Sequence, residues 1–140
     1  MRQKSKINFT YQYSIYNHIL SIVLGILMLN RIEKVNSLLQ QEISKILLRD
    51  FGFSEAMVTL TRVEATGNLI EAKAYISVLP EEKTDKVLGI LNKGVYDVQQ
   101  KINKKLNMRP IPKIIFVKDA VIAEAAKIES LLEKIKEVEK

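Results

Sequence analysis

The hydrophobic positions of the chain change their period several times, and each change marks an expected element. Over residues 30–50, apolar side chains recur every three or four positions, which places them on one stripe of a helix. Asn30 is a suitable N-cap, and Glu33 stands where it could complete a capping box. We therefore expect a helix that begins at Arg31 and ends where Asp50 and Gly52 interrupt the pattern.

The period then falls to two, which is the period of a β-strand. Residues 57–64 and 71–78 alternate apolar and other side chains, and the turn formers between them predict a hairpin. Within residues 113–119, Ile114 and Phe116 would lie on one face of a strand, and Ile115 and Val117 on the other. We expect this segment to be a third strand that is buried on both faces of the sheet.

Helical spacing returns in three further segments. One begins near Thr84, and a second begins at Val95 and ends before Pro110 and Pro112. Gly94 lies between the two, and glycine inside a helix costs about 1 kcal/mol relative to alanine, so we expect a bend or break there. Residues 121–140 form the last helical pattern. The predicted order is helix, strand, strand, helix, bend, helix, strand, helix, an α+β fold with a three-stranded sheet.

The first 27 residues differ in composition from the rest of the chain. They contain three basic residues, no acid, three tyrosines and an apolar run over residues 19–29. That run is about half of the roughly 20 residues that span a bilayer, so no membrane is expected. Three interpretations stay open: translation starts at Met28, the segment is a targeting sequence, or it is an added helix. We expect an extension at 1–27, one domain at 28–120 and a C-terminal helix at 121–140.

Several classes of chemistry are excluded by what the sequence lacks. With no cysteine, the chain has no disulfide, thiolate metal site or cysteine nucleophile, which suits a reducing compartment such as the cytoplasm. The single histidine, His18, lies in the extension, and no glycine-rich phosphate-binding motif occurs. We therefore predict a protein that is not an enzyme and needs neither a metal nor a cofactor.

The positive charge lies in the middle of the chain. The net charge is +6, and residues 92–118 hold seven basic residues against the single acid Asp97, which favours a nucleic-acid partner. Lys101, Lys104 and Lys105 share one face of their helix. The candidate RNA-binding residues are Arg31, Lys34, Lys93, Lys101, Lys104, Lys105, Arg109 and Lys113, with Gly94 and Tyr96 at the expected bend.

Several of these candidates also have an ordinary structural interpretation. The three lysines could form a solvated face, and Arg109 could cap the carbonyl groups at the end of its helix instead of binding phosphate. Tyr96 could stack on an unpaired base, or it could fill space beside the glycine.

The residues together resemble ribosome-binding factor A along nearly all of residues 31–135. The resemblance is carried by Arg31-Ile32 with Val35, by residues 58–63 and 72–78, and above all by the Arg-x-x-Pro-x-Ile-x-Phe-x-x-Asp run from Arg109 to Asp119. It implies a K-homology-like fold of the bacterial type, type II. The family usually has Ala-x-Gly where this chain has Gly94-Val95-Tyr96, and often arginine at Gln99.

The resemblance also implies a function. It would make this chain a cytoplasmic, monomeric, RNA-binding factor of ribosome biogenesis. The implied partners are the small ribosomal subunit and its ribosomal RNA, and the implied role is late rRNA processing and folding by stoichiometric binding. Two alternatives remain: a protein-interaction module that docks through the C-terminal helix, and an RNA binder tethered to a membrane through residues 19–29.

Overall fold

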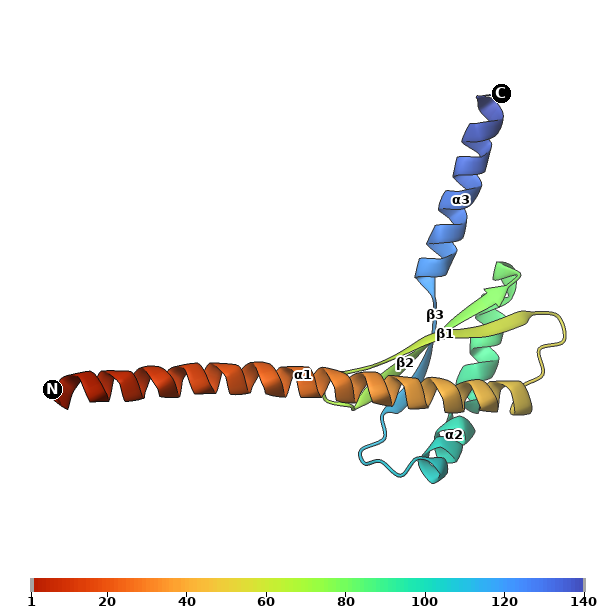
Figure 1. Ribbon diagram of the computed structural model, residues 1–140. Helices are drawn as coiled ribbons and strands as arrows, with labels where there is room; N and C mark the ends of the chain where they lie inside the picture. The colour runs from red at the N-terminus through yellow and green to blue at the C-terminus, as the bar shows by residue number, and fades with distance from the viewer. Residues whose placement is uncertain (1, 140) are drawn as a thin grey trace. The chain divides into compact units, whose positions relative to one another are not determined.

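The computed structural model describes residues 2–139, and it describes side chains from residue 12 onward. The elements are α1 (Arg2–Asp50), β1 (Met57–Ala65), β2 (Glu71–Leu79), the 3-10 turn η1 (Glu81–Lys83), α2 (Thr84–Lys105), β3 (Lys113–Lys118) and α3 (Ala120–Val138), as Figure 1 shows. The chain divides into two compact units, Met1–Lys34 and Val35–Lys140. The α+β class and the order of the elements are those that the sequence predicts.

Helix α1 departs from its predicted start. The capping box at Asn30 predicted a helix from Arg31, but α1 begins at Arg2 and continues through Asn30 without interruption. The prediction was wrong because residues 2–29 contain no proline that would interrupt a helix. An N-cap residue such as Asn30 marks the start of a helix only where the residues before it are not helical. The predicted end at Asp50 is confirmed.

The sheet has the order β1-β2-β3 and is mixed. β1 pairs antiparallel with β2 through the predicted hairpin, with Val58 opposite Val78, and β3 pairs parallel with β2, with Phe116 opposite Ala74. Ile114 and Phe116 are buried, whereas the alternate residues of β3 are only half-buried. The expectation that this strand is buried on both faces is therefore wrong for its second face.

The core lies between the sheet and one side of two helices. Residues 35–50 of α1 and the whole of α2 cover the face of β2 that carries its alternating small and branched side chains. The largest fully buried side chains belong to Leu39, Ile43, Ile76, Leu91, Val98, Ile102, Pro112 and Ile114. These apolar stripes fix which sides of α1 and α2 remain in contact with solvent.

Gly94 is a packing residue in the middle of one helix. The two central helices predicted from the sequence are a single continuous helix, since α2 runs from Thr84 to Lys105. A Cβ atom at Gly94 would lie 2.8 Å from Cζ of Phe51, whose ring stacks on that of Phe53 at 6.1 Å between centroids. The glycine thus admits an aromatic ring against the helix, and it does not end the helix.

We expect Gly94→Ala to be less stable than Gly89→Ala by about 1–3 kcal/mol. The new methyl group at residue 94 must displace the Phe51 ring, whereas at Gly89 it meets no atom within 4 Å. Both substitutions gain about 1 kcal/mol of helix propensity, so Gly89→Ala is the matched control. Urea unfolding followed by circular dichroism measures the difference, and equal free energies of unfolding would contradict the packing role.

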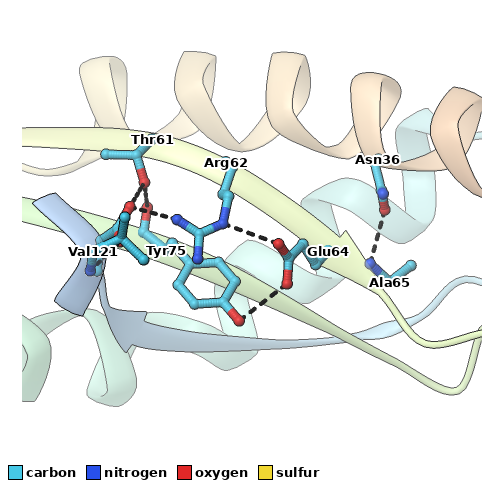
Figure 2. Close-up of polar contacts among 8 residues, drawn as sticks. Asn36, Thr61, Arg62, Glu64, Ala65, Tyr75 and Val121 are labelled. Carbon is cyan, nitrogen blue, oxygen red and sulfur yellow. Dashed lines mark hydrogen bonds and ion pairs between the residues drawn. The ribbon is translucent and has the colours of Figure 1, made fainter.

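Asp119 anchors the first turn of α3 to the sheet. Its buried carboxylate accepts hydrogen bonds from the Thr61 hydroxyl at 2.5 Å, from Arg62 Nη1 at 2.7 Å and, as N-cap, from the backbone N–H of Val121 at 3.1 Å. Figure 2 shows the Arg62 guanidinium over the Tyr75 ring, 3.8 Å from its centroid. No residue of α3 is buried, so this network is its principal attachment.

The same network lowers the pKa of Asp119. The hydrogen bond from Thr61 has the largest effect, burial acts against it, and Arg62 adds a further lowering. A carboxyl group whose pKa is lower in the folded than in the unfolded state contributes stability above its unfolded pKa, about 3.9. That contribution is lost as the pH falls below this value toward the folded pKa.

We expect Asp119→Asn to lower the free energy of unfolding at pH 7 by about 1–3 kcal/mol. The amide keeps the shape of the side chain but loses the charge that Arg62 and Thr61 stabilise. The difference between wild type and variant should be constant above about pH 5 and shrink as the pH falls below about 3.9, because the Asp119 carboxylate of the unfolded wild-type chain then takes up a proton that the folded chain resists. Urea titrations at these pH values test this, and a gap that is constant with pH would show that the charge is unimportant.

Candidate nucleic-acid interface

The exposed side of α2 presents two of the predicted basic residues. Val98 and Ile102 face the core, so the opposite side of the helix meets solvent. Lys93 and Lys104 lie on that opposite side, about three helical turns apart, and both are exposed. Asp97 lies between them as the one acid on this face. Lys86, about two turns before Lys93, is exposed on the same side, so the helix holds three cations in fixed positions there, two of which the sequence analysis singled out.

Gln99 fastens the loop that follows α2. Its Nε2 donates to the carbonyl of Pro112 at 3.1 Å, and its Oε1 accepts from the backbone N–H of Ile114 at 2.9 Å. The side-chain amide thus bonds both partners across the start of β3, and arginine, which has no acceptor, could not do this. Arg109 and Lys113 are exposed on the segment that this clamp holds.

Two lysines of the predicted triad are already paired with acids. Lys101 Nζ lies 2.6 Å from Oδ2 of Asp50, and Lys105 Nζ lies 3.2 Å from Oε2 of Glu42. Among the described residues, Lys104 alone of the three has no acidic partner within 4 Å. A surface depression of about 410 Å³ lies here, lined by Glu42, Ile46, Arg49, Asp50, Lys101, Lys104 and Lys105. The three lysines do not form the uniform cationic face that the sequence predicts.

Glu42 explains the position of Lys105. The Glu42 side chain is only 11% exposed; its Oε1 accepts from Lys45 at 3.2 Å, whereas its Oε2 makes no hydrogen bond among the described residues. Burial raises the pKa of this carboxyl group, but the nearby Lys105 and Lys45 ammonium groups outweigh burial and hold the pKa below its ordinary value. Lys105 therefore compensates a buried negative charge.

The remaining candidates of Val35–Lys140 are free of such partners. Lys93, Lys104, Arg109 and Lys113 are exposed and have no acidic group within 4 Å in the described part of the chain. The backbone N–H of Leu106 makes the last helical hydrogen bond of α2, to the Ile102 carbonyl, and no hydrogen bond among the described residues joins Arg109 to a carbonyl of this helix. Tyr96 is 71% exposed, because Phe51 and not the tyrosine fills the space beside Gly94.

Three further basic residues lie on α1. Arg31 and Lys34 are exposed but belong to the unit Met1–Lys34, so they are not part of the surface described above. Sequence reasoning missed Arg49, an exposed residue in the last turn of α1 that lines the same depression as Lys104. Its only sequence signal is a basic residue at a helix end, which does not reveal what packs beside it.

Comparison with known proteins identifies the family. The family model for ribosome-binding factor A matches residues 31–132. The chain is 33% identical over 114 residues to ribosome-binding factor A of Chlamydia pneumoniae, covering 79% of this chain and 95% of the relative. It is 35% identical over 106 residues to the protein of that name from Prochlorococcus marinus (strain NATL1A), covering 73% and 86%. The chain belongs to the ribosome-binding factor A family.

The fold agrees with a solved structure of the family. The crystal structure of ribosome-binding factor A from Thermus thermophilus superimposes with a TM-score of 0.54 at 14% identity, over 62% of this chain and 94% of that one. Membership in the ribosome-binding factor A family also agrees with the prediction that the protein is a binding factor and not an enzyme. The described residues include no group of three metal-binding side chains.

We expect Lys105→Met to lower the free energy of unfolding by about 1 kcal/mol, a modest value because the lysine is half-exposed. The substitution leaves Glu42 with Lys45 as its remaining cationic partner. Lys104→Met, on the same helix but without an acid to compensate, should change stability by less than about 0.5 kcal/mol. Adding Glu42→Gln to Lys105→Met should recover stability. Urea unfolding of the four proteins tests this, and equal effects of the two lysine substitutions would refute the pairing role.

Proposed function

We propose that this chain binds the ribosome and acts on its small subunit. The role that best fits its family is assistance in late maturation of free or immature small subunits, during the processing and folding of their ribosomal RNA in the cytoplasm. The action is stoichiometric binding by a monomer, followed by release. The observation that supports this most strongly is the family match over residues 31–132.

The RNA contact is assigned to four residues, Lys93, Lys104, Arg109 and Lys113, which we call the RNA surface. All four are exposed and lack an acidic partner among the described residues, so each can replace a counterion on a phosphate. Arg109 offers a planar fork that can hold a phosphate through two hydrogen bonds. Tyr96 is exposed on the same helix, where its ring can stack on an unpaired base.

Lys101 and Lys105 have a supporting role in this proposal. If Lys105 bound a phosphate, the buried Glu42 carboxylate would lose one of its two cationic partners. The free energy cost of that loss opposes the exchange. The pair of Lys101 with Asp50 is more easily exchanged, because Asp50 is 36% exposed whereas Glu42 is only 11% exposed. Arg31 and Lys34 stay candidates for a separate RNA contact in the other unit.

A second candidate function is protein docking through α3. This helix buries none of its residues, and it exposes Val121, Ile122, Ile128, Leu131, Leu132 and Ile135. Exposed apolar side chains at helical spacing are typical of a helix that binds a protein groove. In this alternative the basic side chains serve only to keep the protein dissolved.

Sucrose-gradient sedimentation with purified small subunits at low and moderate salt tests the proposal. We expect co-migration that weakens with salt. The triple variant Lys93→Gln, Lys104→Gln and Arg109→Gln should lose affinity about 10–100-fold at roughly 0.1 M salt. The slope of log affinity against log salt concentration should fall by about 2–3, because three phosphate contacts are removed.

The matched control is Lys73→Gln, Lys127→Gln and Lys136→Gln, which removes the same net charge from three exposed positions on β2 and α3, outside the RNA surface. It should bind nearly as well as the wild type. Equal losses in the two triple variants would show that only net charge matters and would refute the RNA surface. A wild-type chain that stays at the top of the gradient under gentle conditions would refute ribosome binding and favour docking through α3.

A further inference from the structure

The first part of α1 exposes a large apolar surface that the proposed RNA contact does not use. In the unit Met1–Lys34, the described side chains from residue 12 onward are almost all exposed. The exposed large apolar residues of this segment are Tyr13, Ile15, Tyr16, Ile19, Leu20, Ile22, Val23, Leu24, Ile26, Leu27, Met28 and Leu29. An exposed apolar patch of this extent is typical of a surface that contacts another molecule or a membrane.

The uncharged part of this helix is as long as a bilayer is thick. No Asp, Glu, Lys or Arg occurs from Ile7 to Asn30, and a helix of this length extends about 36 Å at about 1.5 Å per residue. The hydrocarbon core of a bilayer is about 30 Å thick. The apolar run over residues 19–29 is shorter than the uncharged segment, because aromatic and neutral polar residues extend that segment back to Ile7. By length and composition, α1 contains a stretch that can cross a membrane.

The pattern around the helix favours lipid over a protein groove. From Ile15 to Leu29, His18, Ser21 and Gly25 form one narrow neutral strip, and apart from Asn17 the side chains on the rest of the circumference are apolar or aromatic. Later in the same helix, residues 35–50 carry a single stripe that is buried in the domain, with Lys45 and Arg49 exposed. A helix that docks on protein shows the second pattern, whereas a helix surrounded by lipid shows the first.

The residues at both ends of the uncharged segment match an anionic membrane surface. Arg2, Lys4 and Lys6 precede it, Arg31 and Lys34 follow it, and no acid occurs before Glu33. Tyr13 and Tyr16, 63% and 66% exposed, stand near its first end, where aromatic residues occupy the boundary between lipid and water. We propose that residues 7–30 insert into a lipid bilayer with anionic headgroups and attach the RNA-binding domain to it.

Flotation of the full-length chain with vesicles tests this inference. The probes are vesicles of phosphatidylcholine alone and of phosphatidylcholine with one quarter phosphatidylglycerol. We expect the chain to float with the anionic vesicles and to stay bound through an alkaline carbonate wash. Val23→Lys with Ile26→Lys should reduce flotation at least tenfold, because two charges would enter the apolar layer.

Ser37→Lys with Gln41→Lys is the matched control, since both positions are exposed on the same helix beyond the uncharged segment. It should float like the wild type. Failure of the wild type to float with either vesicle type, equal flotation of the two variants, or a natural chain whose intact mass lacks residues 1–27 would each overturn the inference. The Val23 and Ile26 variant should still sediment with small subunits without vesicles, so ribosome binding is tested separately.

Discussion

The apolar stripe of α2 is the constraint on which the basic surface depends. Val87, Leu91, Val98 and Ile102 are buried, and each such side chain contributes about 1.5–3 kcal/mol when it leaves water. Rotating the helix to bury Lys93 or Lys104 would forfeit this energy and also desolvate a charge. Phe51 against Gly94 and the Gln99 clamp fix the same orientation from two other sides. The positions of the free cations are therefore consequences of core packing.

Charge compensation within the domain decides which cations remain available. Residues 92–118 contain seven basic residues. Three of them are paired with acids: Lys101 with Asp50, Lys105 with Glu42 and Lys118 with Glu81. The other four have no such partner among the described residues. Those four are the members of the RNA surface. A count along the sequence thus overstates the positive field that a polyanion meets, because acids from distant segments neutralise part of it. Glu42 has the strongest effect, since a buried carboxylate cannot do without a cation.

The sequence predicted what depends on near neighbours and failed where distant segments meet. The strands, the hairpin, the end of α1 at Asp50 and the order of elements follow from periodicity and turn residues, and the structure confirms them. Of the bend or break predicted at Gly94, the break was wrong, because α2 is continuous there and the glycine admits Phe51 from a loop far away in the sequence. The pairing of Lys101 with Asp50, 51 positions apart, had no local signal either.

The run from Arg109 to Asp119, which carried the resemblance, combines two kinds of constraint. Pro112, Ile114 and Phe116 are core residues, and Asp119 is a buried acceptor with three donors. These residues keep β3 in the sheet and α3 attached to it, so their pattern reports the fold. Arg109 is exposed, and the described structure gives it no partner to hold. Packing and charge pairing explain Pro112, Ile114, Phe116 and Asp119 but neither Lys113 nor Arg109, and the phosphate contact that we propose would give both exposed cations a partner.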